Sequence, residues 1–332
     1  MPEVSKAAPR GERARIEELI AREEARVRRA FRRFLDDVRS DVVRRQVRVA
    51  LEREGIESAL RVIDAHVARL GAVITQVFQS AGAAEVAAVG RRLRGTRARV
   101  AVSFDPTYPR AAEIMRRSRL GFVREMTRSQ RESTRAALVE ALQTGAGTVQ
   151  TARALADSIG LTERQRRAVG NYRRLLEAGD AEALNRDLRD RRFDSSVRRA
   201  AETGEPLGAE KIDRMVAQYR NRYLQYRAES IARTATLRAV GQARRESLEQ
   251  VMEQVELPRS QAVRTWAATR DDRVRDTHAG MDGQRVALDE PFESESGARF
   301  MFPGDESLGA PPEEIIQCRC TELYEILEAG AD

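Results

Sequence analysis

The sequence predicts a mainly α-helical, bundle-like fold of long helices, followed by a small C-terminal α+β domain. Apolar residues recur at steps of three, four and seven through most of the first 250 positions, which is the period of amphipathic helices. After Pro258 the pattern changes to short alternating runs separated by turns. The charge changes there too, since residues 1–250 carry a net charge of +17 and residues 251–332 carry −10. We therefore expect a boundary near Pro258.

The N-terminal region, residues 1–103, reads as long helices. An apolar stripe runs from Glu12 to about Glu54 and predicts one helix, with Gly55 as its stop. A second stripe follows from Leu60 to Phe78. Because neither stripe is apolar all round, each needs a partner, and an antiparallel pair of helices is the simplest arrangement.

The middle region, residues 104–257, is also expected to be helical and to end in a long helix. Two short helices joined at Ile159–Gly160–Leu161 have the spacing of a helix-turn-helix, although ordinary helix packing explains them better. The predicted helices run from Pro109 to Gln143, from Thr148 to Ser158, from Glu163 to Glu177 with Thr162 as N-cap, and from Gly208 to about Glu256.

Several classes of protein are excluded by what the sequence lacks. Two cysteines are too few for a disulfide scaffold, and no signal peptide or uninterrupted apolar run long enough for a membrane span is present. Walker, dinucleotide-binding, zinc-protease and hydrolase motifs are also absent. We expect no membrane association and a reducing compartment.

The C-terminal region, residues 258–332, carries a set of short motifs in a characteristic order. They are W-A-A-T-R-D-D-R-V-R-D-T-H-A-G-M-D-G-Q from Trp266, D-E-P-F from Asp289, F-P-G-D from Phe302 and Q-C-R-C from Gln317, preceded by R-A-E-S-I-A-R-T-A from Arg227. Over about residues 225–325 this order resembles the phage Mu F-like family of phage head morphogenesis (minor head) proteins. This sequence has Gln317 where the family usually has Asn, and Ala235 where it usually has Glu.

The resemblance marks a group of residues as structural parts of the family motif. These are Trp266, Asp272, Arg275, His278, Gly283, Phe292, Pro303, Gly304, Asp305, Cys318, Arg319 and Cys320.

The resemblance implies a minor head protein, with no enzymatic activity, that helps to assemble the head and to package or eject DNA. The partners it implies are the portal protein, a major capsid or scaffolding protein, and packaged double-stranded DNA. It implies a location inside the virion head near the portal vertex, and in the host cytoplasm during assembly.

Three side chains of the terminal motif are candidate metal ligands. Cys318 and Cys320 would face the same way on a strand, and His278 follows the first predicted strand. Since the first and last strands of a small α+β unit are often neighbours, we expect the three to converge. Zinc would suit this set, with Asp276 or Asp305 as a fourth ligand. The alternative is a packed cluster without a metal, and no cofactor is certain.

Two further functions remain open. His278 and the nearby aspartates could form a virion-associated, metal-dependent hydrolase or nuclease, although the Asp and Arg residues from Asp271 to Asp276 are expected to pair with one another. A DNA-binding protein without sequence preference would use the basic helices. The candidate DNA contacts are Arg91, Arg92, Arg94, Arg97 and Arg99.

Overall fold

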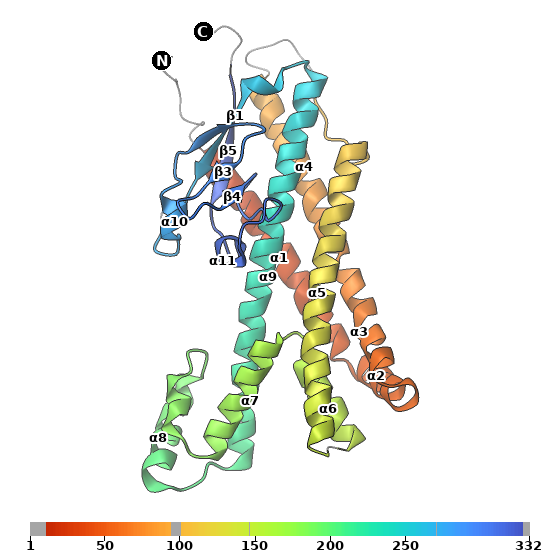
Figure 1. The fold of residues 1–332 in the computed structure, drawn as a ribbon, viewed down its shortest axis with the longest axis vertical. Coiled ribbons are helices and arrows are strands. Elements are labelled where there is room, and N and C mark those ends of the chain that lie inside the picture. The colour runs from red at the N-terminus through yellow and green to blue at the C-terminus, as the bar shows by residue number, and fades with distance from the viewer. Residues whose placement is uncertain (1–10, 94–100, 146, 270, 328–332) are drawn as a thin grey trace. The chain divides into compact units, whose positions relative to one another are not determined.

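The computed structural model describes residues 11–93, 101–145, 147–269 and 271–327 (Figure 1). Helices make up 69% of the chain, and every strand among the described residues lies after Gln261. The predicted fold class, long helices followed by a small α+β part, is therefore confirmed.

The chain forms two compact units, and each contains segments from distant parts of the sequence. Unit 1 comprises residues 1–30, 71–122 and 230–332, and unit 2 comprises residues 31–70 and 123–229. The α-helices of the chain are α1 (Glu12–Val38), α2 (Asp41–Glu54), α3 (Ile56–Leu70), α4 (Ala72–Leu93), α5 (Pro109–Gln143), α6 (Thr148–Ser158), α7 (Glu163–Glu177), α8 (Asp194–Thr203), α9 (Ala209–Gln254), α10 (Asp276–Ala279) and α11 (Pro312–Ile315).

The single helix expected from Glu12 to Glu54 is wrong, because the chain breaks at Ser40. Ser40 is the N-cap of α2, where its hydroxyl accepts a hydrogen bond from the Val43 amide at 3.4 Å. The apolar spacing continues through this break, so periodicity alone does not reveal it. Gly55 ends α2 with a φ of 83°, as its position in the sequence predicted.

Gly71 similarly separates α3 from α4, and the two together form the most apolar part of the chain. The stretch Ile56–Leu93 is long and apolar enough to pass a test for a membrane span, with 56% of its most apolar window buried inside the protein. A buried core helix passes the same test, so this stretch is weak evidence for a membrane.

In unit 2, the turn between α6 and α7 is part of the interior. Ile159 and Leu161 are each 1% exposed, and a Cβ added at Gly160 would collide with the side chains of Leu35 and Leu224. Gly160 also has a φ of 85°, which a side chain disfavours. A buried turn fits ordinary helix packing. The sequence favoured this interpretation over a DNA-binding helix-turn-helix.

Aromatic side chains join α7 to the first half of α9 in the core of unit 2. The rings of Tyr172 and Tyr219 lie 4.4 Å apart, and Tyr223 meets Tyr219 edge-on at 5.1 Å. Ile212 and Met215 complete this cluster from α9. Tyr219 is therefore a core residue rather than a platform for stacking bases.

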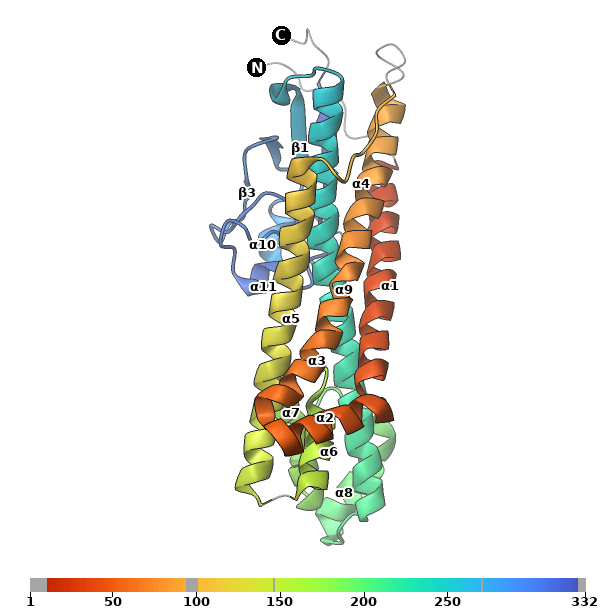
Figure 2. The same ribbon diagram turned by 90° about the vertical axis from the view of Figure 1, so that its right-hand side faces the viewer.

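In unit 1, a three-stranded sheet lies against the second half of α9. Both views show α4 beside this part of α9 (Figures 1 and 2), and the Ser247 hydroxyl donates a hydrogen bond to the Gly82 carbonyl at 3.2 Å. The strands of the chain are β1 (Ala262–Ala267), β2 (Arg285–Ala287), β3 (Phe292–Glu293), β4 (Arg299–Phe300) and β5 (Thr321–Ile326).

The order of the sheet is β2-β1-β5, and β1 pairs antiparallel with both neighbours. The first and last strands are thus adjacent, with Thr265 opposite Leu323. β3 and β4 form a separate two-stranded ribbon. This pairing brings the start and the end of the C-terminal motif region to one place.

A buried ion-pair network ties α1, α4 and α9 to β5 within unit 1. The Glu85 carboxylate is fully buried and accepts hydrogen bonds from Arg15 at 2.7 Å and from Arg244 at 2.9 Å. Arg244 also donates to the Glu322 carbonyl at 2.9 Å, and its guanidinium lies 4.7 Å from the centre of the Tyr324 ring. Burial alone would raise the pKa of Glu85, but Arg244 and Arg15 lower it to about 2.

Acid should weaken unit 1 through this carboxylate. The pKa of Glu85 is about 2 in the folded protein against an ordinary value of 4.5, so its contribution is fully present above pH 4.5 and is lost as the pH falls towards 2. The contribution is on the order of 3 kcal/mol. Urea unfolding at several pH values should show a steeper acid loss for the natural chain than for Glu85→Gln. Equal slopes would contradict the assignment.

Candidate functional site

The three candidate ligands of the terminal motif converge in the interior of unit 1. The Nδ1 atom of His278 lies 3.5 Å from the sulfur of Cys318 and 3.6 Å from the sulfur of Cys320. All three ligand atoms lie within 4.8 Å of one another, and none of the three residues is more than 1% exposed. The predicted convergence is confirmed, while the metal itself stays a prediction.

The expectation that both cysteines lie in the last strand is wrong, because β5 begins only at Thr321. Cys318 and Cys320 occupy the irregular segment just before it. Gln317 has a φ of 59°, in the left-handed region that Asn tolerates better than most residues. This backbone conformation turns the chain so that both sulfurs face His278.

The second nitrogen of His278 faces a carboxylate. His278 Nε2 lies 3.0 Å from Glu314 Oε2, and Glu314 comes from α11. The hydroxyl of Thr277 donates to the same oxygen at 3.0 Å, and that of Ser296 donates to Oε1 at 2.8 Å. Glu314 is only 6% exposed, so the imidazole is held between two sulfurs on one edge and a fixed carboxylate on the other.

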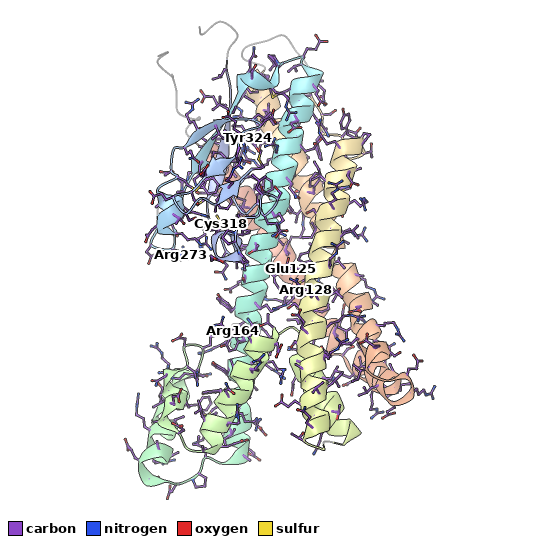
Figure 3. All side chains as sticks on the ribbon, in the orientation of Figure 1. Glu125, Arg128, Arg164, Arg273, Cys318 and Tyr324 are labelled. Atoms are coloured by element: carbon purple, nitrogen blue, oxygen red, sulfur yellow. The ribbon has the colours of Figure 1, made fainter. Side chains whose placement is uncertain are left out.

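Aromatic rings enclose the imidazole. Trp266 of β1 and Phe300 of β4 meet the His278 ring nearly edge-on, with centroid distances of 5.4 and 5.6 Å. Phe292 packs against Trp266 at 5.2 Å. The four side chains are at most 1% exposed, so the rings shield the site from water. Figure 3 shows Cys318 and Tyr324 in this strand region beside α9, with Arg273 at its outer edge.

The two thiols are electrostatically unequal. A hydrogen bond from the Cys318 thiol, assisted by one from His278, lowers the pKa of Cys320 to about 5. The same pairing, together with burial, raises the pKa of Cys318 well above its usual range. The two thiols of the cluster thus differ in acidity.

The helix α9 fixes the cysteine segment through residues of the R-A-E-S-I-A-R-T-A string. Arg233 Nε donates to the Cys318 carbonyl at 2.9 Å, and Arg233 Nη1 lies 3.0 Å from Glu24 Oε2. The hydroxyl of Thr234 accepts a hydrogen bond from the Gln317 amide at 3.1 Å. These contacts hold the Q-C-R-C string against the helical string.

The F-P-G-D string also packs on α9. A Cβ added at Gly241 would collide with the ring of Phe302, and Gly304, with a φ of 85°, lies against Leu237. The carboxylate of Asp305 accepts hydrogen bonds from the amides of Met301 and Ser307, both at 2.9 Å. Gly241 therefore provides the space into which this loop inserts.

Neither aspartate suggested as a fourth ligand joins the cluster. The carboxylate of Asp305 is hydrogen-bonded within its own loop, and Asp276 is exposed at the start of α10. Glu314 is the acidic residue beside the histidine, and sequence reasoning missed it. The available signal was its position four residues before Cys318.

The remaining motif residues have structural contacts or surface positions. Arg275 donates to the Ile316 carbonyl, and the Gly283 amide donates to the Trp266 carbonyl at 2.9 Å. The Arg319 carbonyl accepts from the Thr269 hydroxyl at 2.6 Å, Pro303 is buried and Asp272 is exposed. Nearby, Arg273 pairs with Asp271 at 2.7 Å, so this pair does neutralise itself locally as expected.

The candidate DNA contacts differ in their surroundings. Arg91 is exposed at the end of α4. Arg92 instead donates to the Tyr324 carbonyl at 3.0 Å and lies 3.7 Å from Glu85, so it serves the interior network rather than the surface. Arg94, Arg97 and Arg99 lie outside the described residues.

Residues 191–323 match the family model described as Phage Mu protein F like protein. This match confirms the resemblance that the motifs indicated and extends it upstream to Arg191. The similarity to this family suggests a phage head morphogenesis protein. Comparison with curated proteins found no significant match, and neither did comparison with solved structures.

Proposed function

We propose that the protein is a minor head protein that binds the portal protein, the inner capsid or both, and assists head assembly and DNA packaging or ejection. The family match over residues 191–323 is the observation that carries this proposal. The site supports a structural role for the protein, because its motif residues mainly contact one another and α9. We also propose the major capsid protein or a scaffolding protein as a second binding partner of the chain.

The buried state of the site favours a structural role over the hydrolase or nuclease alternative. A hydrolytic metal centre needs an open coordination position that substrate reaches. His278 is 1% exposed and enclosed by the rings of Trp266 and Phe300. The groups next to it are thiols and Glu314, while Asp271 is paired with Arg273.

The charge distribution supports a division of roles along the chain. Residues 1–250 carry the excess of +17, which attracts polyanions such as packaged DNA. Residues 251–332 carry −10, which disfavours DNA and suits a protein partner such as the portal. These two preferences support a location inside the head near the portal vertex.

The purified chain should bind duplex DNA weakly and without sequence preference. A protein that neutralises about three phosphates loses roughly 40-fold in affinity between about 50 and 200 mM salt. Fluorescence anisotropy with two unrelated duplexes of equal length checks both properties. A binding curve that does not change with salt, or a marked preference for one duplex, would contradict this part of the proposal.

The head-assembly role is tested by complementation in the phage or prophage that encodes the chain. Without the gene, heads should be reduced in number or should lack DNA, and the natural chain should restore them. In cells, the chain should also co-purify with the portal protein of the same phage. Normal numbers of filled, infectious heads in the deletion strain would overturn the proposal.

A further inference from the structure

We propose that His278, Cys318 and Cys320 bind one zinc ion through Nδ1 and the two sulfurs, and that Glu314 is a positioning residue that fixes the imidazole. The ion would join α10 to the segment before β5 and have a structural role. This inference does not depend on the proposed function, because it rests on the geometry of unit 1 alone.

The two sulfur–nitrogen distances are those of a tetrahedral zinc centre. Typical Zn–S and Zn–N bonds of about 2.3 and 2.0–2.1 Å at a tetrahedral angle place a sulfur and a nitrogen about 3.6 Å apart. His278 Nδ1 lies 3.5 Å from the Cys318 sulfur and 3.6 Å from the Cys320 sulfur. The histidine is therefore already at the right distance from both sulfurs for a shared ion.

The other edge of the imidazole lies beside a carboxylate, the kind of group that often orients a zinc-binding histidine. A ligating histidine usually donates its second ring N–H to a carboxylate, which fixes the tautomer and the ring orientation. Glu314 Oε2 lies 3.0 Å from Nε2, close enough for this contact although the ring N–H is not aligned for a hydrogen bond, and Thr277 and Ser296 hold the carboxylate in place. A proton on Nε2 leaves the Nδ1 lone pair directed at the metal position.

Zinc would also allow two thiolates to be buried side by side. Isolated anions are costly to bury, whereas two thiolates and Zn²⁺ together carry no net charge. Cys318 and Cys320 are at most 1% exposed, and aromatic rings cover the histidine. The ion would thus make the polar centre of a small apolar core stable.

The fourth coordination position would be filled by one water molecule enclosed with the ion and closed to substrate by the aromatic rings. Among the described residues, only His278, Cys318 and Cys320 form a group of this kind. Glu314 lies at the opposite nitrogen of the ring and cannot reach the same ion. The carboxylate of Asp305 is occupied by the amides of Met301 and Ser307.

The experiment uses the full chain, purified under reducing conditions and loaded with Zn²⁺. Elemental analysis should find one zinc per chain, and X-ray absorption should find two sulfur neighbours at about 2.3 Å and two nitrogen or oxygen neighbours at about 2.0 Å. The double variant Cys318→Ser/Cys320→Ser should lose the ion. Because this variant could also lose its fold, the coordination shell of the natural chain is the decisive readout.

Glu314→Gln tests the positioning role, with Glu313→Gln as the matched control. The two glutamates are neighbours in α11, but Glu313 is exposed and Glu314 is buried. Chelator competition should show zinc affinity lowered about 10- to 100-fold in Glu314→Gln and unchanged in Glu313→Gln. Equal zinc affinities of the two variants would show that Glu314 does not position the imidazole. A natural chain that binds no zinc, or binds it without sulfur neighbours, would overturn the proposal.

Discussion

Replacing His278 by alanine is expected to lower the free energy of unfolding of unit 1 by about 3–5 kcal/mol, which is what breaking a buried, paired polar centre costs. The change leaves the Glu314 carboxylate and two thiols buried without their common partner, and it opens a cavity between Trp266 and Phe300. This effect does not require the ion, although loss of a bound metal would add to it.

His66→Ala is the matched control, because these are the two histidines of the chain and His66 is partly exposed on α3. Urea unfolding measures the stability of both variants. Hydrogen exchange should show increased exchange near β1 and β5 in His278→Ala while the α7 amides of unit 2 keep their protection. Equal stabilities of the two variants would contradict a structural role for the site.

Replacing Arg244 by alanine should destabilise unit 1 by a similar amount, about 3–5 kcal/mol. Arg244 is 1% exposed. Its loss leaves only Arg15 and Arg92 to compensate the buried charge of Glu85. The substitution also removes the hydrogen bond from Arg244 to the Glu322 carbonyl, which connects α9 to β5.

Arg116→Ala is the control for an ordinary ion pair, because Arg116 and Glu113 pair on the exposed surface of α5. An exposed pair contributes at most about 1 kcal/mol. Thermal or urea unfolding should therefore separate the two variants clearly. A change for Arg244→Ala no larger than that for Arg116→Ala would show that the buried network contributes little.

The helical part of the fold could be predicted where local chemistry marks the ends of helices. Thr162 forms the expected capping box with Gln165, and Pro109 opens α5. The break at Ser40 was missed because the apolar spacing runs through it and no Gly or Pro marks it. A serine within an Arg-rich sequence is too common to identify an N-cap by itself.

The convergence of the three candidate ligands could be predicted, because the topology of the chain determines it. Neighbouring first and last strands bring His278 to the two cysteines, and this required only the order of the elements. The role of Glu314 depends on a contact between two short helices, which no local pattern encodes. Arg233 and Thr234 likewise reach the cysteine segment across more than 80 residues of sequence.

Quantitative mass spectrometry of purified heads tests the central claim, that this chain is a structural component of a phage head. Heads and DNA-free procapsids of the phage or prophage that encodes the chain should both contain it in a few copies per particle, in a fixed ratio to the portal protein. Its absence from both kinds of particle, with the portal and capsid proteins detected, would contradict the account.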